Sequence, residues 1–471
     1  MNIEKYYDLL LAGTRTVRCQ AVQAIENLID LPPALLIDIE QKGLEYTAAS
    51  ISPKNRIQVS EYFEDKSAEL SVFSDSSGFE IKAILGGALE IRNCHDFRLN
   101  LMEIKNIEKK NREKFHIRII GCRNFVVFGG KHIGLRNFIL VSESRDFVLR
   151  DFDVVGCDGY GVVIFNSLFF RVINASFKKC LASGVYCLGK TMYGKIEKTK
   201  FIGGRGYFNW DAGLHINHCT NAIDINDIPE KSHENASIVD KLNKPSYIYV
   251  KDCDFINNRA QGIYCEGGNN IYISNCVIKG NNKEGVCFDW GSAMNGFYSN
   301  HVLQNGNRAA LTAEEIKADF IERYPLLADG SSSCKLAGVS IDNGVFNFIK
   351  NNVFLGNYGG GVKMVRTGIS NLIMDNLFFE NGIGSNEHFR HYNAVSMLGM
   401  GVGDTEFSDS TNNLDFLPST NNVIVGNRMF GSTHYHGVFS SKPCVHNYAS
   451  GNYMYDVGGT ALSDNILRIG D

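Results

Sequence analysis

The chain has 471 residues, of which 44% are hydrophobic, and 47 basic and 51 acidic residues give it a formal net charge of −4. That balance supplies no basic patch of the kind that a nucleic-acid partner needs, so nucleic acid is not an expected partner. No apolar stretch is long enough to span a bilayer, and the N-terminus lacks the pattern of a secretory signal. We therefore expect no membrane partner and a cytoplasmic location, with a phage particle or a secreted form with a trimmed signal as alternatives.

The thirteen cysteines include no CxxC motif, so a zinc site is not expected. Free cysteine behaves as a small buried hydrophobic residue. Because several cysteines fall in or beside predicted strands, we expect them to fill the core as free thiols. A thiol-rich chain suits a reducing compartment.

Residues 1–60 differ in pattern from the rest of the chain. Apolar residues from Val17 to Leu31 recur at helical spacing, and Pro32 and Pro33 then end the predicted helix. An open end of a solenoid exposes its core and its strand edges, and terminal caps are the usual remedy. We interpret residues 1–60 as a capping segment with a helix.

Short apolar segments separated by turn residues begin at about residue 80. The first of them are 88–92, 97–101, 116–120, 125–128, 138–141 and 147–150, and three of these alternate with period two. This pattern predicts short β-strands.

A longer repeat then sets the architecture. Eight segments align on one small residue at a base spacing of 23 residues; they begin at Gly161, Gly184, Gly213, Gly262, Gly285, Gly338, Gly361 and Ala394. A recurring period of this size indicates stacked similar units around one continuous core. Residues 61–471 are therefore predicted to form one solenoid, interrupted by insertions at 220–246, 306–337 and 403–421. Insertions in solenoids become loops on one face, and the first two flank the candidate site described below.

A second register follows a set of asparagines that each come after a predicted strand: Asn275, Asn300, Asn352, Asn376, Asn427 and Asn452. Stacked Asn side chains hydrogen-bond along a ladder, so we interpret these residues as structural.

The Gly-Val-x-x-x strands and the segment Asn-Asn-Val-Phe-Leu-Gly-Asn at 351–357 resemble the right-handed parallel β-helix of the pectin-lyase-like superfamily. The resemblance covers residues 80–465 and implies an all-β fold. It implies no single activity, because the superfamily includes polygalacturonases, other glycosidases, lyases, epimerases, tailspikes and inert scaffolds. Of the polygalacturonase motifs, only the basic pair has a counterpart here, in Lys363 and Arg366.

The alternation of side chains along the repeated strands points to a candidate site. The first and third residues after the aligned glycine are apolar and face the core, so the second and fourth face outward. Glu266, Asp289 and Asp342 occupy the fourth position of three successive repeats, and neighbouring coils lie about 4.8 Å apart. The repeat therefore predicts a row of three carboxylates.

Other polar and aromatic residues are expected around this row. His215, Tyr264 and Lys363 hold the outward second position, Asn217 holds the fourth position one repeat earlier, Asp211 and Arg366 lie at strand ends, and Trp290 follows Asp289. A protonated acid beside an ionised carboxylate is the arrangement used in glycoside hydrolysis. Our leading hypothesis is a glycoside hydrolase that cleaves an acidic, uronate-containing polysaccharide. Asp289 and Asp342 would be the acid/base pair, Glu266 would support them, and no cofactor would be needed.

Within this hypothesis, Lys363 and Arg366 would bind a sugar carboxylate, while Tyr264 and Trp290 would stack on sugar rings. Carboxylates on adjacent coils favour retention of configuration and those on alternate coils favour inversion, so both outcomes stay open.

Two other functions fit the same residues. Calcium on Glu266, Asp289 and Asp342 would acidify the proton beside a uronate carboxylate, with Lys363 as the base of a lyase or epimerase. The third hypothesis is a non-catalytic glycan-binding or structural β-helix. In each case the expected partner is a polysaccharide or oligosaccharide, and a homo-oligomer stays open.

Overall fold

The computed structural model describes residues 70–85, 88–104, 115–206, 211–218, 244–289, 291–307, 336–342, 344–365, 368–382, 393–398, 419–431, 437–440, 444–455, 462 and 466–468. It also describes three two-residue strands nearer the N-terminus: β1 (Ala34–Leu35), β2 (Glu45–Tyr46) and β3 (Gln58–Val59). The helix predicted at 17–31 and the interiors of the three insertions lie outside these residues. In the described part, all regular structure is β, and no helix there is long and apolar enough to cross a membrane.

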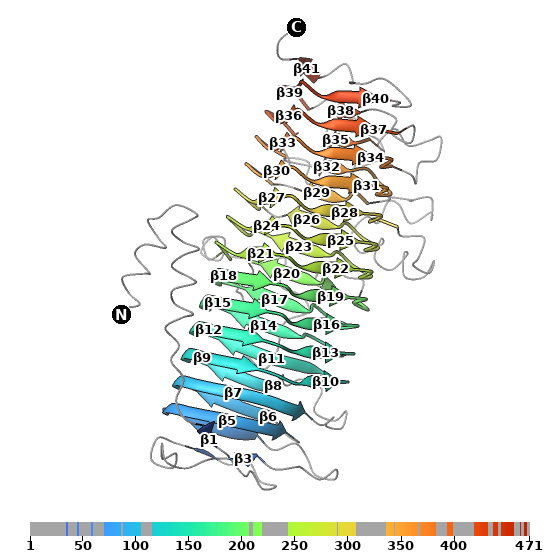
Figure 1. Ribbon diagram of the computed structural model, residues 1–471. Helices are drawn as coiled ribbons and strands as arrows, with labels where there is room; N and C mark the ends of the chain where they lie inside the picture. The colour runs from blue at the N-terminus through green and yellow to red at the C-terminus, as the bar shows by residue number, and fades with distance from the viewer. Residues whose placement is uncertain are drawn as a thin grey trace, which may run out of the picture. The chain divides into compact units, whose positions relative to one another are not determined.

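The chain forms two compact units, residues 1–200 with 217–249, and residues 201–216 with 250–471. Within each unit the strands form three parallel sheets, here called A, B and C (Figure 1). Strands β1 to β9 belong to sheets A and B alone, and from β10 to β40 each turn of the chain adds one strand to every sheet. This is the parallel β-helix that the repeat predicted. Strands β19 (Lys200–Ile202), β20 (Leu214–Asn217) and β21 (Tyr249–Lys251) have residues in both units.

In the first unit, sheet A contains β1, β5 (Ser77–Leu85), β7 (His95–Ile104), β9 (Arg123–Phe128), β12 (Arg145–Arg150), β15 (Leu168–Ile173) and β18 (Met192–Glu197), and β3 also pairs with β5. Sheet B contains β2, β4 (Leu70–Ser74), β6 (Ala88–Arg92), β8 (Phe115–Ile120), β11 (Asn137–Ser142), β14 (Val162–Phe165) and β17 (Val185–Leu188). Sheet C contains β10 (Lys131–Ile133), β13 (Asp153–Val155) and β16 (Ser176–Lys178). The six segments predicted between residues 88 and 150 all lie within these strands.

In the second unit, sheet A contains β24 (Tyr272–Ser274), β27 (Gly296–Tyr298), β30 (Phe348–Lys350), β33 (Leu372–Met374), β36 (Val423–Val425), β39 (Asn447–Ser450) and β41 (Ile466–Arg468). Sheet B contains β23 (Ile263–Glu266), β26 (Val286–Asp289), β29 (Val339–Asp342), β32 (Val362–Val365), β35 (Val395–Leu398) and β38 (Val438–Ser440). Sheet C contains β22 (Asp254–Ile256), β25 (Val277–Lys279), β28 (His301–Leu303), β31 (Val353–Leu355), β34 (Leu377–Phe379), β37 (Arg428–Phe430) and β40 (Tyr453–Tyr455).

Identical core positions in successive coils stack directly on one another. In the first unit the rings of Phe79, Phe97, Phe125, Phe147 and Phe170 form one column, with centroids 4.9 to 5.8 Å apart. The column ends at Gly194, where a Cβ atom would lie only 2.0 Å from the Phe170 ring. Glycine is required there because the Phe170 ring occupies the space of a side chain.

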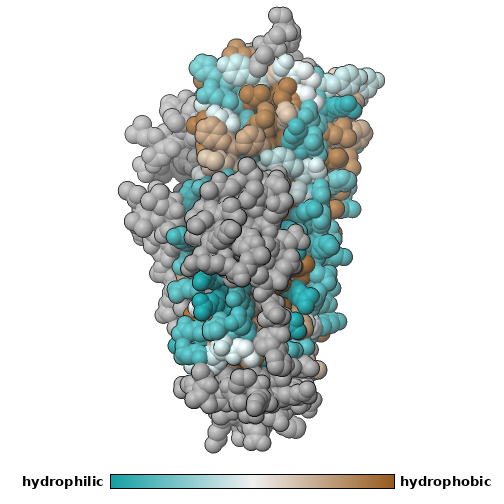
Figure 2. Space-filling view, turned by 60° about the vertical axis from the view of Figure 1, so that its left-hand side comes forward, coloured by the Kyte–Doolittle hydropathy of each residue, from teal (hydrophilic) through white to brown (hydrophobic). Residues whose placement is uncertain are grey.

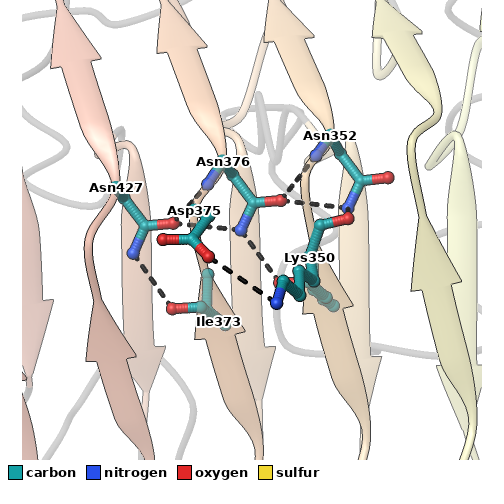
Figure 3. Close-up of polar contacts among 7 residues, drawn as sticks. Lys350, Asn352, Ile373, Asp375, Asn376 and Asn427 are labelled. Carbon is teal, nitrogen blue, oxygen red and sulfur yellow. Dashed lines mark hydrogen bonds and ion pairs between the residues drawn. The ribbon is translucent and has the colours of Figure 1, made fainter.

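Buried asparagines line all three corners of the second unit, whereas the sequence indicated one ladder. The corner between sheets A and C carries Asn300, Asn352, Asn376, Asn427 and the partly buried Asn452. Figure 3 shows three of them, Asn352, Asn376 and Asn427. The corner before sheet A carries Asn295, Asn347, Asn371, Asn422 and Asn447, and the corner before sheet B carries Asn258, Asn281, Asn305, Asn357 and Asn381. Each side-chain amide hydrogen-bonds to a carbonyl or an amide of a neighbouring coil. The ladders therefore give hydrogen-bond partners to the polar groups of the turns, which lie between the sheets.

The prediction that Asn275 belongs to the ladder was wrong. Asn275 has a φ of 54° at the turn, and the next residue, Cys276, occupies the ladder position. The Cys276 backbone N–H donates to Asn300 Oδ1 at 2.9 Å. The shift by one residue arises because the left-handed turn residue precedes the ladder residue in every coil.

Large apolar side chains also appear on the outside of the second unit. Phe348 on sheet A, and Leu355, Phe379, Tyr453 and Tyr455 on sheet C, are all exposed. Figure 2 shows apolar side chains gathered toward the C-terminal end on the face in view. The late coils therefore present apolar outward columns.

Candidate functional site

The outer face of sheet B is buried, which sets it apart from an ordinary solvated solenoid surface. In the first unit, the outward residues Leu140, Val163, Phe165, Tyr186 and Leu188 belong to one buried apolar cluster. In the second unit the outward residues of the same sheet change from apolar to polar and ionisable. This change of chemistry on a covered face defines the candidate site.

Strand register arranges the three carboxylates in successive coils. Glu266 of β23 pairs with Asp289 of β26. In the next pair of strands Phe288 lies beside Ile341, so Asp289 and Asp342 follow as the adjoining residues of β26 and β29. The insertion at 306–337 adds no coil between these strands, and the strands that carry neighbouring carboxylates are therefore about 4.8 Å apart.

Two of the carboxylates receive ordered partners from the second-position column. The Tyr264 hydroxyl donates to Asp289 Oδ2 at 2.9 Å. His215 Nε2 lies 3.4 Å from Glu266 Oε2, and the His215 and Tyr264 ring centroids are 5.0 Å apart. A hydrogen bond from a phenol to a carboxylate favours the ionised form of the acid. The arrangement thus couples two proton-carrying side chains to two acids in a buried place.

Exposure increases along the row. Glu266 is 1% exposed and Asp289 is 6% exposed, whereas Asp342 and Lys363 are partly exposed. Lys363 lies on β32 beside Ser340 of β29, one coil beyond Asp342. The row is therefore less covered at the side of Asp342 and Lys363 than at the side of Glu266.

Four other residues were singled out in the sequence, and the structure describes two of them, Asn217 and Asp211. Asn217 belongs to the first unit, where its amide donates to the Tyr186 hydroxyl at 3.0 Å. Trp290 and Arg366 lie outside the described residues. Asp211 is buried two residues before Gly213, at the entry to β20 rather than in the row.

Lys283 is a residue that the sequence reasoning missed. Its side chain is 1% exposed, two residues before the aligned Gly285, where the preceding repeat has Ala260. A lysine that replaces a small residue in a repeat column was the available signal. Among the residues that the structure describes, no group of three His, Cys, Asp or Glu side chains is arranged to hold a metal ion.

Comparison with solved structures finds proteins of similar architecture at low identity. The A-module of the mannuronan C-5 epimerase AlgE4 of Azotobacter vinelandii is 12% identical, with 97% of this chain and 96% of that chain covered and a TM-score of 0.40. A single-site mutant of the periplasmic alginate epimerase AlgG is 11% identical, with coverage of 94% and 89% and a TM-score of 0.48. The DFA-IIIase of Arthrobacter chlorophenolicus A6 is 11% identical, with coverage of 93% and 92% and a TM-score of 0.42.

No protein of curated function matches the sequence. The family model described as right handed beta helix region matches residues 137–302 and 212–396, which together extend over more than half of the chain. With the three parallel sheets found in each unit, this match establishes that the chain belongs to the right-handed β-helix family.

Proposed function

We propose that this protein hydrolyses an acidic polysaccharide on the outer face of sheet B in the second unit, with Asp289 and Asp342 as the reacting carboxyl groups. The observation that carries the proposal is the pairing of a buried carboxylate, held by the Tyr264 hydroxyl, with a partly exposed carboxyl one coil away. The proposed reaction needs a proton on Asp342, and an ionised Asp289 one coil away favours it. Two identical aspartate side chains thereby take different roles, one as an ionised carboxylate and one as a protonated acid.

The reaction follows from these two states. The Asp289 carboxylate attacks the anomeric carbon while the glycosidic bond breaks and its oxygen takes the proton of Asp342. In the second step Asp342 removes a proton from water, and the resulting hydroxide displaces Asp289 from the anomeric carbon. Carboxyl groups about 5 Å apart are typical of retaining enzymes, so the proposal predicts a product with retained configuration.

Lys363 is the reason for proposing an acidic substrate. Its side chain is partly exposed one coil beyond Asp342, at the accessible side of the row. An ammonium group there binds a uronate carboxylate in the adjoining sugar unit. His215 and Glu266 lie on the buried side, where the His215 ring lies beside Tyr264 and its Nε2 lies 3.4 Å from Glu266 Oε2.

A second candidate function rests on the contact between His215 and Tyr264. An imidazole and a phenol whose centroids are 5.0 Å apart supply a base and an acid for proton transfer at the carbon beside a uronate carboxylate. That chemistry is β-elimination or epimerisation.

Turnover on a panel of acidic and neutral polysaccharides, with and without chelator, separates the candidates. Hydrolysis yields new reducing ends without the ultraviolet absorbance of unsaturated uronides, and proton NMR of the first product shows the retained anomer. Asp289→Asn and Asp342→Asn should each lower kcat by about 10²- to 10⁴-fold. Asp375→Asn is the control, since Asp375 is an exposed carboxylate of the same unit.

Full activity in both Asp289→Asn and Asp342→Asn would refute the proposed roles. Absorbance that disappears with chelator would instead identify a calcium-dependent lyase. Binding of a glycan without any turnover would identify a non-catalytic β-helix.

A further inference from the structure

A groove lies on the first unit at the corner between sheets A and C, and we call it the corner groove. It spans three successive coils, from Asp151–Asp153 through Asn174–Lys178 to Lys198–Lys200, and has a volume of about 390 Å³. Pockets for small ligands usually measure about 300–1,000 Å³. The groove is therefore large enough for a ligand of one or two sugar rings.

Strand register orders the polar side chains of the groove. Asp153 of β13 pairs with Ser176 of β16, and Lys200 begins the strand β19 that follows in sheet C. The turn residues Asp151, Asn174 and Lys198 form a second column, with φ angles of 61°, 51° and 50°. Both columns thus run from an acid through a neutral polar group to a lysine.

The two columns place Asp151 and Asp153 at one end of the groove and Lys198 and Lys200 at the other. Arg150, 3.7 Å from Asp151, and Lys178, 2.9 Å from Asp153, reduce this charge gradient. The coils that carry the acids and the two lysines lie about 10 Å apart. That distance is comparable with the span of a substituted sugar ring together with its linkage. A ligand that fits the gradient has hydroxyl groups at one end and an anionic group at the other.

Hydrogen bonds within the groove hold the acids in place. Asn174 Nδ2 donates to Asp151 Oδ1 at 2.7 Å, and Lys178 Nζ lies 2.9 Å from Asp153 Oδ1. Lys178 and Asp153 are 40% and 34% exposed, and exposed ion pairs contribute little to stability, so a ligand displaces this one easily. The Asp carboxylates keep acceptor capacity for vicinal hydroxyls, because each has two oxygens and about four lone-pair sites.

Ser176 also lines the groove, and its hydroxyl is covered and has no hydrogen-bond partner among the described residues. Such a group is unfavourable in the folded chain.

We propose that the corner groove is a non-catalytic binding site for a sugar unit with an anionic substituent, such as a uronate carboxylate or a sulfate. Hydroxyl groups of the sugar bind to Asp151 and Asp153, and the anionic substituent binds to Lys198 and Lys200. The groove holds a polymer on the first unit without reacting with it. This inference does not depend on the proposed hydrolysis, because it concerns other residues and needs no turnover.

Calorimetric titration of the full chain tests the proposal with three probes: a trimer of galacturonate, a sulfated oligosaccharide and a neutral maltotriose. The double variant Lys198→Ala/Lys200→Ala should bind the acidic probe at least tenfold more weakly at the groove and lose one binding event. The double variant with arginine at both positions should retain that event, because it keeps the charge. The control is Lys350→Ala, which removes an exposed lysine from an ion pair of the second unit.

Lys363→Ala separates this site from the one on sheet B, since it should remove turnover or its substrate affinity and leave the groove event intact. Preference for the uronate or for the sulfated probe identifies the source of the anionic group. Unchanged stoichiometry and affinity in the alanine double variant, with an unchanged thermal midpoint, would overturn the proposal. Equal binding of maltotriose at the groove would overturn its acidic specificity.

Discussion

At the residue scale, Tyr264 determines the behaviour of Asp289. The bond from its hydroxyl to Asp289 Oδ2 is buried, and a hydrogen bond to a charged group contributes about 1.5–3 kcal/mol. Under the proposed function, Tyr264→Phe should lower kcat/KM by about tenfold to a hundredfold. The acid limb of the pH–rate profile should move to higher pH, because the ionised carboxylate loses a donor.

A pH–rate profile of wild type and Tyr264→Phe checks this expectation. Tyr186→Phe is the matched control, since the Tyr186 hydroxyl is bonded to Asn217 in the first unit. An unshifted acid limb in Tyr264→Phe would show that Tyr264 does not act through Asp289.

Asp146 makes stability depend on pH through burial. Desolvation raises the pKa of this carboxyl to about 6, against the opposing charges of Arg145 and Arg123. A raised pKa in the folded state means that the stability contribution is complete below about pH 3.8 and is lost as the pH rises through 6. At about 1.4 kcal/mol per unit, the loss amounts to about 3 kcal/mol.

The variant Asp146→Asn should remove this loss, so the free energy of unfolding of the variant should exceed that of wild type increasingly between about pH 4 and pH 6.5. Asparagine suits the left-handed backbone at this position, because Asn124 has a φ of 52° one coil earlier. Burial lowers the pKa of His116 to about 4, which acts in the opposite direction but equally in both proteins. Denaturant titrations at several pH values measure the difference, and parallel curves would contradict the prediction.

At the element scale, the asparagine ladders supply hydrogen-bond partners to the polar groups of the turns. Asn376 Oδ1 accepts from the backbone N–H and the side-chain amide of Asn352, and its own amide donates to Ile349 O at 2.9 Å (Figure 3). Asn376→Ala should leave these groups without hydrogen-bond partners, at a cost of about 1–3 kcal/mol for each group. The free energy of unfolding should therefore fall by several kcal/mol.

Asp375→Asn supplies the control for that measurement. Asp375 is the neighbouring residue, 47% exposed and 3.8 Å from Lys350 Nζ, and such exposed pairs contribute at most about 1 kcal/mol. Denaturant midpoints measure the loss of stability in both variants. Comparable losses would mean that the asparagine ladder does not stabilise the corner between sheets A and C.

At the scale of the whole molecule, the reactivity of the cysteines measures how well the core is closed to solvent. Among the described residues, ten cysteines are free and buried, as the sequence predicted, and burial raises the pKa of the Cys187 and Cys122 thiols. Thiolate is the reactive form, so these side chains should be inert in the folded chain.

Titration with a thiol reagent should therefore modify no more than three of the thirteen cysteines in the native protein and all thirteen in denaturant. Rapid modification of more than three native thiols would show that the core opens readily or that its cysteines are placed elsewhere.

The sequence by itself determined the solenoid and the alternation of its strands. Both are local or strictly repeating signals, because side chains alternate with period two and the aligned glycines mark each coil. The same logic placed Glu266, Asp289 and Asp342 in one row, since equivalent positions of stacked coils must be neighbours.

Tertiary structure alone decided which outward positions are covered and which groups meet. The partners of Tyr264 and Asn376 lie 25 and 51 residues away, so no local pattern specifies their bonds. Burial of the outer face of sheet B depends on the whole chain, and the shift from Asn275 to Cys276 depends on the φ angle of a single turn residue. The corner groove is lined by residues of successive coils. Its depth and its gradient of charge arise only when these coils stack.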